Sequence, residues 1–234
     1  MTTPLLLAAP LLAGALITGV AAPAFADGSP SPTPSRTAAS LSGLQAAGAA
    51  DTSKRITSLT AAITRITAAK GLTDADRTTI LDTLNADLTG MRSLASKIAA
   101  DTTVAQARAD VRSIFTQYRV YAVALPQARI AVEADRLSGT TIPRLQAAAS
   151  KLASRVSASG NSGAQAELAD LTTQLSTAQA DVNGLSAAAL AVTPSDDDAD
   201  HSAMTALRDK AKAALAAVKQ AAQDAKGIRQ SLKK

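Results

Sequence analysis

The sequence predicts an all-α protein, an elongated antiparallel helical bundle of about six coiled-coil-like helices. Six stretches repeat apolar residues at alternating spacings of three and four, which keeps one stripe of each helix facing its neighbours. About a quarter of the residues are Ala, the best helix former, and no stretch alternates apolar and polar residues as a half-buried strand does. The clearest run consists of Ala164, Leu168, Leu171, Leu175, Ala178, Val182, Leu185, Ala189 and Val192.

The composition limits how such a bundle is stabilised. Aromatic residues make up 2% of the chain and Cys is absent, so the packing of small aliphatic side chains must supply the stability. Ala at a seam position lets two helices approach closely, but it buries little apolar area. We therefore expect slim helices packed lengthwise around a thin core.

The first expected helix spans residues 37–70, and Gly43 and Gly48 weaken its first half, which is expected to fray. The second helix begins at Thr73, with Asp76 three residues later as the partner in a capping box. The apolar seams of these two helices are Ile56, Leu59, Ile63 and Ile66, then Leu81, Leu84, Leu88, Met91, Ala95 and Ile98.

The third expected helix spans residues 104–137, and Thr103 with Gln106 caps its start. Pro126 removes one backbone hydrogen bond from the interior of this helix, so a kink or a break is expected there. The helix is expected to stop at residues 137–139, whose sequence is Leu-Ser-Gly.

The fourth expected helix begins around residues 141–143, because proline suits the first turn of a helix. It ends in the Ser- and Gly-rich residues 159–163. Residues 160–163 are therefore the candidate boundary between two sub-bundles within residues 37–234.

The fifth expected helix starts at Ser162, with Gln165 as its capping partner, and it stops at Pro194. The sixth follows Ser195, with Asp198 three residues later, and it continues to the end of the chain. Short connections between such long helices predict antiparallel neighbours.

The first 26 residues are expected to be an export signal. An apolar run over residues 5–20 ends in Ala24-Phe25-Ala26, the pattern that a signal peptidase reads, and residues 27–36 form a Ser- and Pro-rich linker. No later segment is apolar for long enough to cross a bilayer. The predicted location is secreted or otherwise extracytoplasmic, with association with the cell envelope.

Positive charge gathers at the end of the chain. The formal net charge is +5, and residues 208–234 alone carry eight basic residues against two acidic ones. A basic helix is attracted to anionic wall polymer or lipid headgroups, although an ordinary solvated basic face would show the same composition. The candidate contacts with an anionic surface are Lys219, Lys226, Arg229, Lys233 and Lys234.

Every aromatic residue after the signal lies in one short window, at Phe115, Tyr118 and Tyr121. On one side of a helix and close to Pro126, these side chains would form a ligand platform for a sugar or a peptide. The spacing also fits a bulky core layer in a bundle otherwise packed with Ala and Leu. We favour the core layer, because Tyr118 and Tyr121 occupy seam positions.

An acidic cluster precedes His201, the single histidine of the chain. A carboxylate-rich loop with one imidazole could hold a divalent cation, but the spacing matches no calcium loop, and acidic residues also suit the start of a helix. We favour capping and predict no metal site. The cluster consists of Asp196, Asp197, Asp198 and Asp200.

The sequence offers little for catalysis. There is no thiol, no G-x-S-x-G, no H-E-x-x-H and no phosphate loop, and a Ser-His-Asp arrangement would rest entirely on His201. The glutamates, Glu133 and Glu167, fall on different expected helices. We therefore predict a non-enzymatic protein without a cofactor.

Two short segments stand out from the Ala-rich background. The first is Arg119-Val120-Tyr121 followed by Leu125-Pro126 and Arg129, and the second is Thr193-Pro194 followed by Ala199-Asp200-His201. Both resemble stretches of uncharacterised secreted, Ala-rich helical proteins of actinobacteria, in which Asn often stands where this chain has Asp198. The resemblance implies an exported helical protein, and it brings no activity, ligand or catalytic residue with it.

Two functional hypotheses follow. The favoured one is an exported structural or interaction protein of the cell envelope or extracellular space, which meets anionic wall polymer or a membrane surface through its basic last helix. The alternative is a ligand-binding module that uses the Tyr118/Tyr121 region next to Pro126. Nucleic acid is not an expected partner, and self-association stays open because heptad seams serve both intramolecular and intermolecular pairs.

Overall fold

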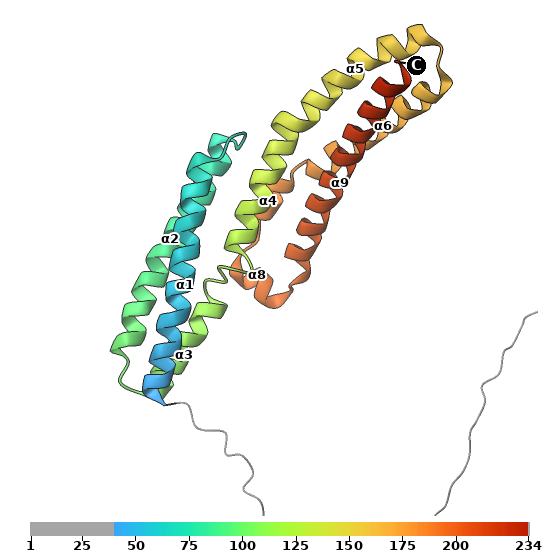
Figure 1. The fold of residues 1–234 in the computed structure, drawn as a ribbon. Helices are drawn as coiled ribbons and strands as arrows, with labels where there is room; N and C mark the ends of the chain where they lie inside the picture. The colour runs from blue at the N-terminus through green and yellow to red at the C-terminus, as the bar shows by residue number, and fades with distance from the viewer. Residues whose placement is uncertain (1–39, 234) are drawn as a thin grey trace, which may run out of the picture. The chain divides into compact units, whose positions relative to one another are not determined.

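The computed structural model describes residues 40–233, which contain helices and no strand. The predicted all-α helical bundle is confirmed, with helices packed side by side along their lengths (Figure 1). The expected signal (residues 1–26), the linker (residues 27–36) and Lys234 lie outside the described residues. The helices are α1 (Leu41–Ala68), α2 (Asp74–Ala100), α3 (Val104–Thr116), α4 (Ala124–Arg136), the π-helix η1 (Leu137–Thr141), α5 (Ile142–Ser159), α6 (Ser162–Val182), α7 (Leu185–Ala191), α8 (Pro194–Ala199) and α9 (Ser202–Ser231).

Helices α1, α2 and α3 pack around one apolar cluster. Leu59 of α1, Leu84 and Met91 of α2, and Ile114 of α3 are fully buried in it. Leu59, Leu84 and Met91 belong to the predicted heptad seams, so the period of the apolar pattern correctly predicts which face of α1 and of α2 is buried.

Gly48 lies where α1 meets two other helices. A Cβ at position 48 would lie 2.9 Å from the side chain of Ile98 in α2 and 3.0 Å from that of Val111 in α3. The expected fraying of the first half of α1 is wrong. The glycine weakens the isolated helix, but it lets three backbones approach closely enough for tertiary packing to hold the helix in place.

Thr73 caps the start of α2, as the sequence predicts, but the hydrogen bonds of this cap differ from the predicted ones. The Thr73 hydroxyl accepts a hydrogen bond from Asp76 N at 3.2 Å, as expected. The Thr73 N–H is taken by Asp135 of α4, at 2.8 Å, and the Asp76 carboxylate accepts a hydrogen bond from Ser186 of α7. The reciprocal box is therefore replaced by contacts that join α2 to α4 and α7.

The third expected helix is broken rather than kinked, and the break lies before Pro126. Helix α3 ends at Thr116, residues 117–123 form turns, and α4 begins at Ala124. Pro126 is the third residue of α4, where its missing N–H takes no bond from the helix interior. The predicted box of Thr103 and Gln106 at the start of α3 is confirmed.

The chain continues from α4 through η1 into α5, so the stop predicted at residues 137–139 is wrong. The Ile142 N–H bonds to the carbonyl of Leu137, five residues earlier, and Pro143 follows with no N–H to place. Helix α5 begins within the expected residues 141–143, but as the continuation of an existing helix.

Packing explains this π-turn. Leu137 and Ile142 are both buried in one apolar cluster with residues of α6 and α9. Five residues advance an α-helix by about one and a half turns, which would place these two side chains on different faces. The extra residue of the π-turn allows both of them to reach the same core.

Helices α5, α6 and α9 form the second group of three (Figure 1). Small side chains are frequent among their buried residues, and Ala164, Ala178, Ala214 and Ala221 are fully buried. Together with Leu171 and Ile228 they fill the space between helices with little area per residue, as the composition predicts.

The caps of α6 and α8 differ from the predicted ones by one and two residues. Asn161 caps α6 by accepting from Ala164 N at 3.0 Å, in place of the predicted pair Ser162 and Gln165. The fifth expected helix is also divided, because Gly184 takes a left-handed φ of 68° between α6 and α7.

Helix α8 has its capping box at Thr193 and Asp196, so the predicted pair Ser195 and Asp198 is wrong. Pro194 takes the first helical position, which leaves the preceding Thr193 as the cap. Residues 40–233 lie in one compact unit, and no helix among them combines the length and apolarity of a membrane span.

Asp87 on α2 gives the fold a testable dependence on pH. Burial raises the pKa of this half-buried carboxyl from 3.8 to about 6. The folded protein therefore binds this proton more tightly than the unfolded chain, and the contribution of Asp87 to stability falls as the pH rises from about 4 to about 6. At pH 7 the buried carboxylate is destabilising.

We predict that Asp87→Asn raises the free energy of unfolding at pH 7 by on the order of 1 kcal/mol, because the amide carries no charge to desolvate. The gain should disappear below about pH 4. Urea denaturation at pH 4 and pH 7 measures both values, with Asp82→Asn at an exposed site of the same helix as the control. An equal gain in both variants, or a gain that persists at pH 4, would contradict this.

Candidate binding surfaces

The segment between α3 and α4 is held in place by an ion pair with α8. Arg119 has a left-handed φ of 42°, which is uncommon for a residue other than glycine. Its guanidinium donates to Asp197 at 2.7 Å and also to Asp198. The side chains of Arg119 and Asp197 are 14% and 5% exposed, so this contact is largely shielded from water. The ion pair thus stabilises a strained backbone.

The remaining members of the acidic cluster serve other partners. Hydrogen bonds from Thr193 lower the pKa of Asp196, and hydrogen bonds from Ser202 lower that of Asp200. His201 Nδ1 lies 3.5 Å from Asp197, with its side chain largely exposed. The four carboxylates are thus divided among Thr193, Arg119 and Ser202, and no group of three potential metal ligands occurs among residues 40–233.

The three aromatic residues do not share one helix face, because α3 ends between Phe115 and Tyr118. Phe115 and Tyr121 are each 47% exposed and flank the buried Arg55, whose Cζ lies 4.6 Å and 5.0 Å from the two ring centroids. The Tyr121 hydroxyl also lies 3.0 Å from Ser58 Oγ of α1. The expected common layer is therefore wrong for Phe115 and Tyr121.

Tyr118 packs against the core, as the sequence predicts. Its ring is partly buried against the first apolar cluster and covers Gly90 of α2, where a Cβ would lie 2.6 Å from the Tyr118 hydroxyl oxygen. The aromatic window therefore contains one packing residue, Tyr118, and two partly exposed rings around an arginine.

A groove of about 400 Å³ lies between α4 and α9. Tyr121 is at its edge and Pro126 is in its wall, so the region named in the alternative hypothesis does contain a hollow. Tyr118 does not line it. The apolar part of the lining consists of Tyr121, Leu125, Pro126, Ile130, Ala211 and Leu215.

The charged part of the same lining is predominantly basic. Arg129 of α4 and Arg208 and Lys212 of α9 line the groove, against Glu133 as the single acidic residue of the lining. Glu133 is already ion-paired with Arg136, one turn further along α4. The groove therefore joins apolar walls to an excess of positive charge.

The described basic residues predicted as surface contacts are all exposed: Lys219, Lys226 and Arg229 on α9, and Lys233 in the turn that follows it. Lys212, Lys219 and Lys226 recur every seven residues along this helix, so they share one stripe about 10 Å apart. Binding of an anionic surface by these residues stays a prediction, but the structure shows that their charges lie close together.

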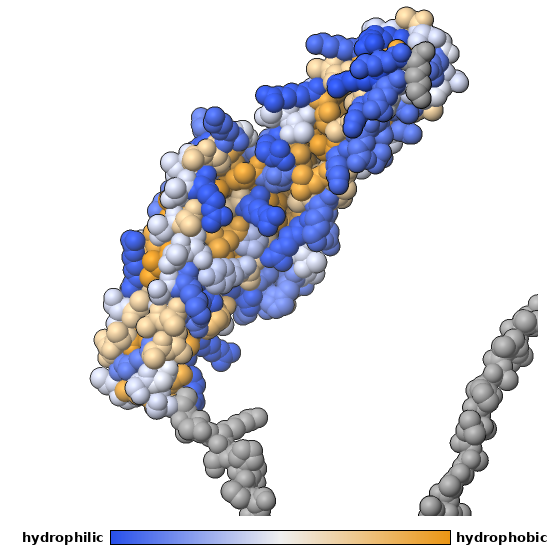
Figure 2. All heavy atoms as spheres, in the orientation of Figure 1, coloured by the Kyte–Doolittle hydropathy of each residue, from blue (hydrophilic) through white to orange (hydrophobic). Residues whose placement is uncertain are grey.

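Helix α5 extends the basic surface. A depression of about 360 Å³ is lined by Arg144, Lys151 and Arg155 of α5 and by Arg229 of α9, with no acidic residue in the lining. All four side chains are exposed, and hydrophilic side chains project from this part of the molecule in Figure 2. We call Arg144, Lys151, Arg155, Lys219, Lys226, Arg229 and Lys233 the α5–α9 basic surface.

Sequence analysis missed the three cations of α5. Their spacing of seven and four residues puts them on one helix face, and that signal was present in the sequence. The sequence does not show that this face lies beside α9, because the apolar pattern of one helix does not specify which other helix it packs against.

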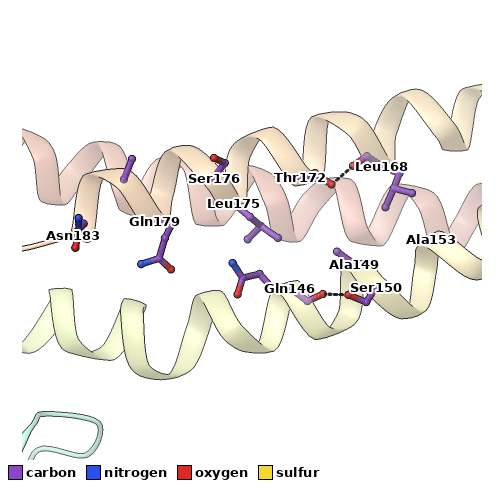
Figure 3. Close-up of a pocket in the computed structure, with 11 residues that line it drawn as sticks. Gln146, Ala149, Ser150, Ala153, Leu168, Thr172, Leu175, Ser176, Gln179 and Asn183 are labelled. Atoms are coloured by element: carbon purple, nitrogen blue, oxygen red, sulfur yellow. Dashed lines mark hydrogen bonds between the residues drawn. The ribbon is translucent and has the colours of Figure 1, made fainter.

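A third hollow, between α5 and α6, has an uncharged lining. It is an open depression of about 810 Å³, and Figure 3 shows Gln146 of α5 and Gln179 of α6 extending toward one another across it. Ser150 and Thr172 use their hydroxyls on backbone carbonyls one turn earlier in their own helices. The depression has no charged or titratable group with which to select a ligand.

Comparison of the chain with family models, with curated proteins and with solved structures gave no match. The resemblance to secreted actinobacterial proteins therefore stays a prediction. The two segments that carry it meet in space, since Arg119 of the first contacts Asp197 and Asp198 within the second.

We predict that Gly90→Ala lowers the free energy of unfolding by about 1–2 kcal/mol, because the new methyl group collides with the Tyr118 ring. Thermal or urea denaturation checks this. Gly139→Ala is the matched control, since a Cβ there meets nothing within 4 Å. Adding Tyr118→Ala to Gly90→Ala should cost less than the two single changes together, and strict additivity would show that the contact is absent.

We predict that Asp197→Asn lowers the melting temperature by several degrees, because Arg119 loses the buried carboxylate that stabilises its strained backbone. Asp209→Asn removes a carboxylate from an exposed pair with Lys212 and should leave the melting temperature nearly unchanged. Differential scanning calorimetry on both variants checks this. Equal melting temperatures would show that the ion pair of Arg119 with Asp197 does not stabilise the fold.

Proposed function

We propose that the chain is an exported, non-enzymatic interaction protein that attaches to anionic polymer or lipid of the cell envelope through the α5–α9 basic surface. The observation that supports this most is the depression in which Arg144, Lys151, Arg155 and Arg229 converge from two helices with no acidic residue among them. On an ordinary solvated surface, charges of both signs are interspersed.

The geometry suits a flat or extended anionic partner better than a small ligand. The cations are exposed and spread along two helices, and the lysine stripe of α9 repeats at about 10 Å. Charges at that distance are screened from one another at physiological salt, so each one interacts separately with a nearby anion. Such attachment is multivalent, moderate in strength and sensitive to salt.

We predict that replacing Arg144, Lys151 and Arg155 together with Gln weakens attachment about a hundredfold at low salt, at about 1 kcal/mol for each lost charge. Co-sedimentation of the full chain with purified cell wall, and separately with vesicles that contain anionic lipid, measures the affinity. Gln keeps the helix propensity of the original residues, so the circular dichroism spectrum should not change.

The matched control replaces three exposed cations of α1, α2 and α3, namely Lys54, Arg92 and Arg108, with Gln. It changes the net charge by the same amount, at helices outside the α5–α9 basic surface. Equal weakening in both variants would mean that only net charge matters. Unchanged binding in the α5 variant would reject the proposal.

A second candidate function is a ligand-binding module, which one observation favours. The groove between α4 and α9 places an exposed aromatic ring, a proline wall and three basic side chains around a space of about 400 Å³. This is the region that the sequence indicated through Tyr121 and Pro126, with Tyr118 now outside it.

A further inference from the structure

We infer that the groove between α4 and α9 binds a small amphiphilic anion, with its apolar body against Tyr121 and Leu215 and its carboxylate or phosphate head between Arg129 and Lys212. This inference rests on the second candidate function, and it is independent of attachment through the α5–α9 basic surface. The α5–α6 depression has an uncharged lining, and the depression at Arg144 and Arg229 has no exposed large apolar side chain, whereas the α4–α9 groove combines exposed apolar side chains with several cations.

The apolar contribution comes from side chains that the fold leaves uncovered. Among residues 40–233, four large apolar side chains are notably exposed, and two of them, Tyr121 at 47% and Leu215 at 39%, face this groove. Ile130 and Ala211 form buried parts of the same lining. Clustered apolar exposure beside polar groups is typical of binding sites rather than of general surface.

The Tyr121 ring is already oriented before any ligand binds. Arg55 lies 5.0 Å from its centroid, and the hydroxyl is within hydrogen-bond distance of Ser58. A ring fixed in this way loses little conformational entropy on binding, which favours a defined contact over non-specific adsorption.

The charge of the groove selects an anionic head. Arg129 and Lys212 are exposed at the groove and come from different helices. Arg208 uses one donor on the carbonyl of Ala122, at 3.1 Å, and a guanidinium has five. The contact of Lys212 with Asp209 is an exposed surface pair, which competes only weakly with a bound anion.

The size of the groove sets the class of ligand. A space of about 400 Å³ lies at the lower end of the range for small-molecule sites. A single head on a short apolar body fits that volume, and both a free carboxylate and a phosphate monoester present the geometry that Arg and Lys recognise.

The chain supplies its own reporter for the test. It contains two Tyr residues and no Trp, so in Tyr118→Phe all tyrosine fluorescence comes from Tyr121 at the groove. Decanoate and decyl phosphate, titrated below the concentrations at which they form micelles, are the anionic probes. Decanol is the uncharged probe with the same apolar body.

We expect a saturable change in Tyr121 fluorescence with decanoate or decyl phosphate, and much weaker binding of decanol. Arg129→Gln and Lys212→Gln, each made in the Tyr118→Phe background, should weaken binding of the anion about tenfold, because a hydrogen bond to a charged group is lost. Lys210→Gln, at an exposed position of the same helix outside the groove lining and outside the α5–α9 basic surface, should leave the affinity unchanged.

Each contrary outcome has a distinct meaning. Equal binding of decanol and decanoate would overturn the anionic class while keeping a ligand site in the groove. Saturable binding that is equally weakened by Lys210→Gln would assign the effect to net charge and overturn the inference. No saturable change with any probe would overturn both the inference and the second candidate function, whereas co-sedimentation with cell wall would be unaffected.

Discussion

One constraint organises the rest of the structure: residues 124–159 run as a single helix through a π-turn. Ala124, Ala128 and Ala131 of its first half are buried in the cluster of α1 and α2, whereas Leu137 and Ile142 are buried with α6 and α9. The two groups of three helices therefore share this helix. It also supplies one wall of the α4–α9 groove from its first half and three cations of the α5–α9 basic surface from its second half.

Small side chains allow the helices to pack this closely, and they also make the packing sensitive to any substitution that adds volume. Gly48 faces α2 and α3, and Gly90 faces Tyr118. At both positions one added methyl group would collide with a side chain, so close packing replaces the bulk that larger core side chains would provide. Buried Ala contributes little area, and the margin of stability depends on good fit and on a few polar contacts between segments distant in sequence, such as Arg119 with Asp197 and Thr73 with Asp135.

The sequence predicted the parts of the fold that depend on local period and caps. The heptad spacing correctly placed the buried faces of α1, α2 and α6, and Thr103 with Gln106 formed the expected box. The sequence-based prediction failed where tertiary contacts determine whether a helix continues. Ser-Gly at residues 138–139 favours a helix end in isolation, but burial of Leu137 and Ile142 keeps the helix intact. The basic character of α9 and the role of Tyr121 near Pro126 were accessible, whereas the contribution of Arg144, Lys151 and Arg155 required knowledge of which helices pair.

The continuity of residues 124–159 is the claim on which the positions of both binding surfaces depend. Amide hydrogen exchange, followed residue by residue by NMR, tests it most directly at residues 138–142, which the sequence marks as a break and the structure shows as a π-turn. The account predicts that these amides exchange as slowly as the buried turns of α4 and α5 on either side. Exchange at the rate of an unstructured chain, between two protected helices, would contradict it.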